Sequence, residues 1–176
     1  MMKTFVLRQL SPAVVGSLVA DSAVCADNMP LFVPDGEWMC QARMALRIDR
    51  LGKSIKPQFA RRYYGAFTLV NYLRRADSLA PEGGAIDQCV IHGRWLPIAD
   101  AAPEVAVEVA DLRYSGVVEV DFSAIDEAIS ELSRLSTFKT GDIIILPNPI
   151  LSFTPSPQSA FKGLINSEEV LNFRIL

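Results

Sequence analysis

The chain has 176 residues, of which half are hydrophobic and 21% are charged, and its formal net charge is −3. These proportions exclude a disordered or fibrous protein, and the length predicts one domain with a sizeable core over residues 1–176. The mild acidity argues against a nucleic-acid binder. Arg61, Arg62, Arg74 and Arg75 form a local basic group that we interpret as solvated surface.

The cysteine pattern excludes two kinds of small, stapled protein. Cys25, Cys40 and Cys89 are widely spaced, no CxxC pair occurs, and His92 is the single histidine, so neither a zinc site nor a disulfide framework is expected. The uncharged run 13–20 is short for a signal peptide and far below the ~20 residues of a membrane span. We therefore expect a cytoplasmic protein without a membrane partner.

The first half of the chain predicts four strands and one helix. Alternating apolar residues or β-forming composition place strands at 3–10, 31–33, 43–48 and 67–73, with the third strand half exposed. Pro57 fits the first turn of a helix in which Phe59, Ala60, Tyr63 and Tyr64 share one face. The segment 80–84 is expected to be a loop.

The second half adds strands around a second helix. Strands are predicted at 89–91, 105–109 and 117–122, the last two pairing through a turn at 114–116. Ser123, with Asp126 three residues on, predicts a helix start, and Ile125, Ile129, Leu132 and Leu135 then line one face. A buried strand at 143–146, a proline-rich loop at 147–157 and a closing hairpin of 163–165 with 170–175 complete the chain.

Many short strands with two main helices predict an α+β fold with a β-rich, curled mixed sheet. Four segments then resemble the fumarylacetoacetate hydrolase family in their order and spacing. The first segment is Asp21-Ser22-Ala23 together with 31–34. The second is 43–68, with its Arg-Leu-Gly-Lys turn and Phe-Ala-x-Arg-Tyr-Tyr run, and the third is 86–97. The fourth is 125–146, which contains Phe-Lys-Thr-Gly-Asp-Ile-Ile-Ile-Leu.

The resemblance implies a β-roll fold, a homodimer, and a site where three carboxylates hold Mg²⁺ or a similar cation that polarises small 2-oxo or β-diketo acids. Two of these carboxylates form Glu-x-Glu on one strand, and this pair aligns with Gln41-Ala42-Arg43. The third, an aspartate on the next strand, aligns with Asn71. Arg75 matches a family arginine, Gly84 replaces a family lysine, and Pro147-Asn148-Pro149 replaces Gly-Thr-Pro.

These substitutions reverse the charge of the implied site. A guanidinium has no acceptor and stays charged, so Gln41, Arg43 and Asn71 would repel the cation that three carboxylates attract. No cofactor is therefore expected, with Mg²⁺ or Mn²⁺ as the alternative. Arg43 and Arg75 could instead hold a small carboxylate, together with Gln41, Asn71 and Asn148. Alternatively, Arg43 pairs with a nearby acid in a collapsed pocket.

Other residues have both a functional and a structural interpretation. Asp35 and Glu37 could be displaced metal ligands or ordinary turn carboxylates. His92 could be a general base or a strand-end histidine bonded to backbone. Asp87 matches a family aspartate and could equally serve a turn.

Three hypotheses about function follow. The first is a pseudoenzyme that has lost the metal and either binds a small anion or acts as an interaction subunit. The second is an active hydrolase or isomerase of 2-oxo acids whose site is rebuilt from Asp35, Glu37, Asp77, Glu82 or Asp87. The third is a structural subunit that pairs with an active paralogue.

Overall fold

The computed structural model describes residues 1–77 and 86–176. Residues 78–85, which contain the predicted 80–84 loop, Glu82 and Gly84, lie outside the described part. Within it the helical elements are η1 (Asp21–Ala23), α1 (Pro57–Ala60) and α2 (Phe122–Leu135). The strands are β1 (Thr4–Gln9), β2 (Val14–Val19), β3 (Val24–Ala26), β4 (Trp38–Ile48), β5 (Tyr64–Arg75), β6 (Val90–His92), β7 (Leu96–Pro97), β8 (Glu104–Val109), β9 (Leu112–Val117), β10 (Ile143–Phe153), β11 (Ala160–Ile165) and β12 (Glu168–Arg174).

In this part of the chain the strands form two sheets. The larger one has the order β2-β1-β10-β4-β5-β6-β3, with β7 also paired to β5, and the smaller one has the order β12-β11-β8-β9. β1 pairs in parallel with β10 and β3 with β6, whereas the other pairs are antiparallel. The expected β-rich mixed sheet with two helices is confirmed.

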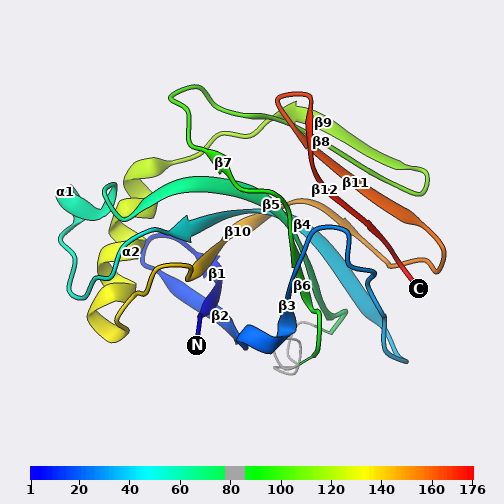
Figure 1. Ribbon diagram of the computed structural model, residues 1–176, viewed down its shortest axis with the longest axis horizontal. Helices are drawn as coiled ribbons and strands as arrows, with labels where there is room; N and C mark the ends of the chain where they lie inside the picture. The colour runs from blue at the N-terminus through cyan, green and yellow to red at the C-terminus, as the bar shows by residue number, and fades with distance from the viewer. Residues whose placement is uncertain (78–85) are drawn as a thin grey trace.

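The large sheet curls into an arch, which Figure 1 shows edge-on. Ser17 of β2 lies close enough to the Tyr72 hydroxyl on β5 to interact with it, although three strands separate β2 from β5 in the sheet order. Such a contact requires the two strands to face each other across the concave side. The concave side therefore carries Tyr72 and the β4 residues that share its face, namely Gln41 and Arg43.

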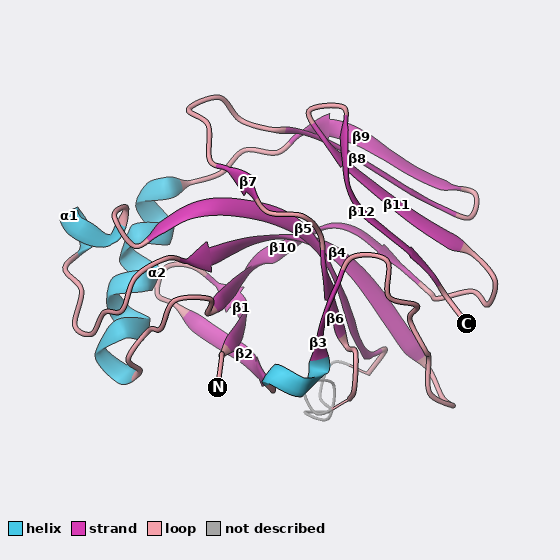
Figure 2. Cartoon of the chain, in the orientation of Figure 1, coloured by secondary structure: helices cyan, strands magenta, loops and turns pink. Residues whose placement is uncertain are grey.

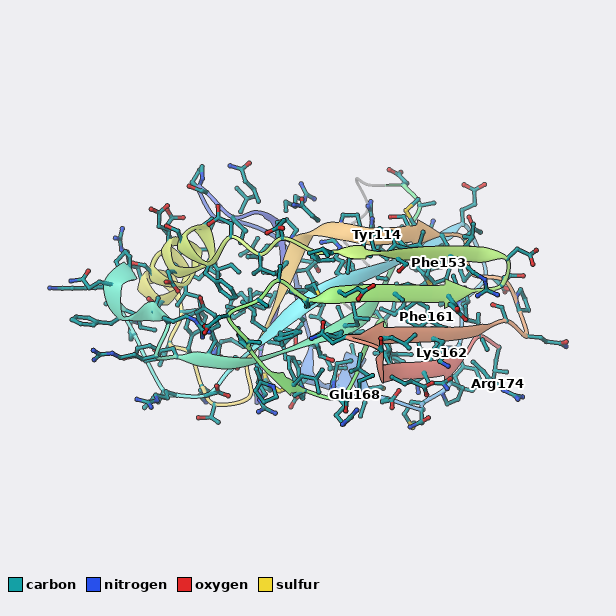
Figure 3. The ribbon with its side chains drawn as sticks, turned by 90° about the horizontal axis from the view of Figure 1, so that it is seen from above. Tyr114, Phe153, Phe161, Lys162, Glu168 and Arg174 are labelled. Atoms are coloured by element: carbon teal, nitrogen blue, oxygen red, sulfur yellow. The ribbon has the colours of Figure 1, made fainter. Side chains whose placement is uncertain are left out.

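The small sheet packs on the convex side of the arch. Phe153 on β10 stacks on Phe161 at 6.0 Å between ring centroids, and Phe161 stacks on Phe173 of β12 at 4.8 Å. Figure 3 looks down on the small sheet, where Lys162, Glu168 and Arg174 are exposed to solvent. Because β4 lies at the centre of the arch between these layers, it is buried on both faces, and the predicted half-exposed strand is wrong.

Several predicted boundaries need correction. The segment 31–33 forms only a single bridge, between Leu31 and Ile175. The helix at Pro57 ends at Ala60, and Tyr64 already begins β5, because Tyr64 pairs with Ile48. Leu135 ends α2 with 85% of its surface exposed, so it does not belong to the buried face of Ile125, Ile129 and Leu132.

Two errors concern turns and prolines. The β8–β9 turn lies at Ala110-Asp111 rather than at 114–116, with Ala110 at φ 49°, and so 112–117 rather than 117–122 pairs with β8. β10 continues through the predicted loop to Phe153, but its register against β4 shifts between Ile145 and Pro149. The prolines lack an N–H donor, so they interrupt the ladder without ending the strand. The expected closing hairpin is confirmed as β11 and β12.

A buried cation in the concave face

Gln41 and Arg43 lie in the middle of β4, where alternation points both side chains into the concave side. Arg43 is 8% exposed and Gln41 is 6% exposed. The cross-strand partners of Gln41 and Arg43 on β5 are Tyr72 and Val70. The aligned pair of positions therefore does share one face, as the Glu-x-Glu pattern implies.

Asn71 does not join this pair. It is the partner of Ala42, so it projects to the convex face, where its Nδ2 lies 3.6 Å from the Cys40 sulfur. Partners in an antiparallel ladder share a face, and one step along the strand reverses it. The β5 residue that faces Gln41 and Arg43 is Tyr72, whose ring centroid lies 5.8 Å from the Arg43 guanidinium carbon. A register shift between Arg47 and Ile48 lies beside the β4–β5 turn, so alternation counted from the turn would pair Gln41 with Asn71, and the sequence carries no signal that identifies Tyr72.

Arg43 is held by neutral oxygen atoms from three strands. Its Nη1 donates to the carbonyl oxygens of Leu7 on β1 (3.2 Å) and Leu146 on β10 (3.3 Å). Its Nε donates to Gln41 Oε1 at 3.1 Å, and its Nη2 donates to the same oxygen. The bonds to Leu7 and Leu146 lie where β1 and β10 stop pairing and β10 shifts its register against β4. The guanidinium thus donates to two carbonyl groups at the point where the proline-containing ladder is irregular.

The charge of Arg43 has no carboxylate partner in residues 1–77 and 86–176. The alternative of an arginine paired with a nearby acid is therefore wrong for these residues. Burial lowers the pKa of Arg43 to about 10, with Tyr72 opposing the shift and Arg74 adding to it. The side chain remains a cation at neutral pH.

The other predicted anion-binding residues lie elsewhere. Arg75 is the partner of Trp38, so it projects to the opposite face from Arg43 and lies five residues, roughly 17 Å, further along β5 than Val70. It stacks on the Trp38 ring at 5.2 Å. Asn148 is exposed in the shifted part of β10. The structure therefore does not bring Arg43 and Arg75 together to hold one carboxylate.

The acidic candidates also stay apart. Asp35, Glu37 and Asp87 are exposed, and Asp35 accepts a bond from the Trp38 indole only through its backbone oxygen. Across the described ranges, no group of three or more His, Cys, Asp or Glu side chains gathers as a metal site would require. His92 Nδ1 lies 2.9 Å from the Gly93 carbonyl oxygen, which agrees with a strand-end histidine bonded to backbone.

The donor set formed by Gln41, Arg43 and Tyr72 on the concave face does not fit a divalent cation. It offers one amide oxygen, a phenol and a fixed positive charge, whereas Mg²⁺ and Mn²⁺ prefer anionic oxygen ligands. A separate cavity of about 140 Å³ lies on the convex side, between β4 and the segments 98–103 and 119–122. None of the predicted site residues lines it.

Comparison with solved structures shows the same fold in proteins of the fumarylacetoacetate hydrolase family. A family protein from Yersinia pestis CO92 matches with a TM-score of 0.84 and 17% identity, over 100% of this chain and 93% of that one. The 2-hydroxyhepta-2,4-diene-1,7-dioate isomerase of Mycobacterium marinum gives a TM-score of 0.83 and 16% identity, over 99% and 74%.

Fumarylpyruvate hydrolase from Pseudomonas aeruginosa, solved with Mn²⁺ and pyruvate, gives a TM-score of 0.82 and 15% identity, over 100% and 90%. No protein-family model and no curated protein matches the sequence. At these identities the likeness is one of fold, and it confirms the fold that the four sequence segments indicate.

Proposed function

Taking as premise a fold shared with fumarylacetoacetate hydrolase family proteins, we propose that this chain is a non-catalytic protein of that fold. In this proposal a built-in cation, the Arg43 guanidinium, takes the place of the divalent metal. The protein then acts by binding another molecule, not by metal-dependent chemistry on 2-oxo acids.

The hydrogen bonding of Arg43 is the observation that carries the proposal. Four hydrogen bonds to Leu7, Leu146 and Gln41 use four of its five N–H donors. Tethered in this way, the cation stays in the concave face and repels a divalent ion at short range. It also has too few free donors for the two-point grip by which an arginine holds a carboxylate. The proposal therefore does not include an anion bound to Arg43.

Calorimetric titration of the purified chain with Mn²⁺ and with Mg²⁺ tests this proposal. We expect no saturable binding, and no hydrolysis of acylpyruvates when either metal is added. One-site binding with a micromolar dissociation constant, or metal-dependent turnover, would overturn the proposal.

A variant with restored acids tests the cause of the loss. Gln41→Glu, Arg43→Glu and Tyr72→Asp together place three carboxylates on one face of β4 and β5. If circular dichroism shows that this variant folds, we expect it to bind Mn²⁺. A folded variant that does not bind would mean that these three positions do not explain the loss.

If the triple variant does not fold, the double variant Gln41→Glu with Arg43→Glu, which keeps the Tyr72 ring, is titrated in its place. The control in each titration is Gln41→Glu with Arg43→Glu and Asn71→Asp, whose third carboxylate projects to the opposite face. We expect this control to bind Mn²⁺ more weakly than the variant that carries Tyr72→Asp.

A further inference from the structure

One end of the molecule gathers positive charge, although the chain as a whole carries a net charge of −3. The loop between β4 and β5 runs beside α2, and Figures 1 and 2 show α1 and α2 together at this end. The exposed cations at this end of the molecule lie on the β4–β5 loop, in the last turn of α2 and just after α2. They are Arg50, Lys53, Lys56, Arg62, Arg134 and Lys139.

These six cations have no ion pair in the described part of the chain. The neighbouring acids are engaged elsewhere. Asp49 pairs with Arg47 at 3.5 Å, and Asp126 accepts the Tyr64 hydroxyl at 2.7 Å. Glu131 accepts the Ala13 backbone N–H at 2.6 Å. Asp126 and Glu131 keep their negative charges, but neither forms an ion pair with the six cations, which outnumber them.

Three apolar side chains stand among the cations. Leu135 is 85% exposed, Leu51 is 70% exposed and Phe59 is 41% exposed, with the Arg62 guanidinium 5.0 Å from the Phe59 ring centroid. Exposures this high mean that both leucines protrude into solvent. We call the surface formed by the six cations and these three apolar residues the basic end.

The backbone holds the loop part of the basic end firmly against α2. Gly52 and Phe138 exchange two backbone hydrogen bonds, of 3.1 and 2.8 Å. Ser54 donates to the Ser133 carbonyl at 2.9 Å, and the Ile55 N–H donates to Ser133 Oγ at 2.8 Å. The segment that carries Leu51 and Lys53 is therefore fixed beside the segment that carries Arg134 and Leu135.

We propose that the basic end binds the surface of an anionic lipid bilayer. Cations around protruding apolar side chains suit the boundary between headgroups and acyl chains, where charge attraction and apolar burial add. An acidic peptide would need a groove for its side chains, and the cavity described above is lined by other residues. A nucleic acid would gain nothing from exposed leucines.

Binding of this kind is peripheral, and it replaces the expectation from the sequence that the protein has no membrane partner. In the ranges that the structure describes, no helix has the length and apolar character needed to cross a bilayer. The inference is independent of the proposed function, because none of its residues touches Arg43 or the concave face. A failed metal prediction and a failed lipid prediction are thus separately recognisable.

Co-sedimentation with vesicles tests the inference. We expect the chain to bind vesicles of 70% phosphatidylcholine and 30% phosphatidylserine, to bind pure phosphatidylcholine poorly, and to be released by high salt. Lys53→Glu with Lys56→Glu should weaken binding roughly 25-fold or more, since each basic residue near such a surface contributes about fivefold. The control Lys162→Glu with Arg174→Glu makes the same change of charge on the small sheet and should have little effect.

A second pair of substitutions tests the apolar contribution. Leu51→Ser with Leu135→Ser keeps the charge and should also weaken binding to the anionic vesicles. Failure to sediment with these vesicles, or equal losses in the Lys53/Lys56 and Lys162/Arg174 variants, would overturn the inference. Tight binding to polyglutamate or to duplex DNA without vesicle binding would show that the basic end binds that polymer and not a bilayer.

Discussion

At the scale of single residues, Arg43 is a buried cation stabilised by neutral oxygens alone. Desolvation disfavours the charge, and the depressed pKa of Arg43 reflects that cost. The cost is offset because the guanidinium donates hydrogen bonds to the oxygens of Leu7, Leu146 and Gln41. The side chain therefore fastens three strands at the point where their ladder is irregular.

We expect Arg43→Met to lower the free energy of unfolding by about 3 kcal/mol, since three buried acceptors lose their donor at about 1 kcal/mol each or more. Urea unfolding followed by circular dichroism measures the change. Arg113→Met is the control, because Arg113 forms only an exposed ion pair with Glu108 and should change stability by less than about 0.5 kcal/mol. A more stable Arg43→Met variant would show that desolvation of the charge outweighs its hydrogen bonds.

At the scale of elements, the start of α2 differs from the sequence prediction. The N-cap is Asp121, whose Oδ1 accepts the Ala124 N–H at 3.0 Å, and Ser123 lies already inside the first turn. Both residues are good caps by type. The path of the chain from β9 into the helix decides between them, and one sequence does not show that path.

The corrected cap gives a direct comparison of two neighbouring residues. Asp121→Ala should lower the free energy of unfolding by about 1 kcal/mol, whereas Ser123→Ala should leave it nearly unchanged. Thermal unfolding of both variants measures the difference. The opposite order would restore Ser123 as the cap.

The contact between α2 and β5 predicts a dependence of stability on pH. Burial raises the pKa of Asp126 above its ordinary value of 3.8, while the bond from Tyr64 and the charge of Arg61 partly oppose the shift. The folded state therefore holds this proton more tightly than the unfolded state. The stability that the group contributes is full below pH 3.8 and is lost as pH rises through the raised pKa.

Asp126→Asn removes this dependence. The melting temperature of the wild type minus that of the variant should be larger at pH 3.5 than at pH 7, because Asp126 contributes stability in its protonated form. Taking the difference removes the effects of the other titrating groups, which both proteins share. A difference that grows towards pH 7 would mean that the ionised form of Asp126 is the stabilising one.

At the scale of the whole molecule, the two sheets meet closely at Gly93. The Arg94 N–H beside it donates to the Val170 carbonyl of the small sheet at 2.7 Å. A Cβ on Gly93 would lie 2.4 Å from that carbonyl oxygen and 2.9 Å from Thr68 Oγ1. This glycine is needed for close approach, and a backbone group cannot move aside as a flexible side chain can.

Gly93→Ala should therefore destabilise the protein by about 1–3 kcal/mol through overpacking at the junction of the sheets. Gly65→Ala is the matched control, because its Cβ would approach only the end of the Asp49 side chain, at 3.0 Å. Chemical denaturation of both variants checks this. Equal stability of the two would show that the sheets can separate slightly at no cost.

The sequence by itself determined the β-rich class, most strands, the closing hairpin and the change of residue types at the aligned metal positions. These follow from local composition, from alternation and from which side chains can ligate a metal, all of which act over a few residues. The same local signals misplaced the end of β10, because its partner β4 lies far away in the sequence. They also misplaced the β8–β9 turn and the α2 cap, because more than one nearby residue suits each of these roles by type.

Only the tertiary structure decided which side chains meet. One step of register separates Tyr72 from Asn71 and sends them to opposite faces, so Tyr72 and not Asn71 faces Arg43. The partners of Arg43 come from β1 and β10, which lie far from β4 in the sequence. Likewise, the basic end exists because folding lays the loop of residues 50–62 beside the end of α2, a proximity that composition does not encode.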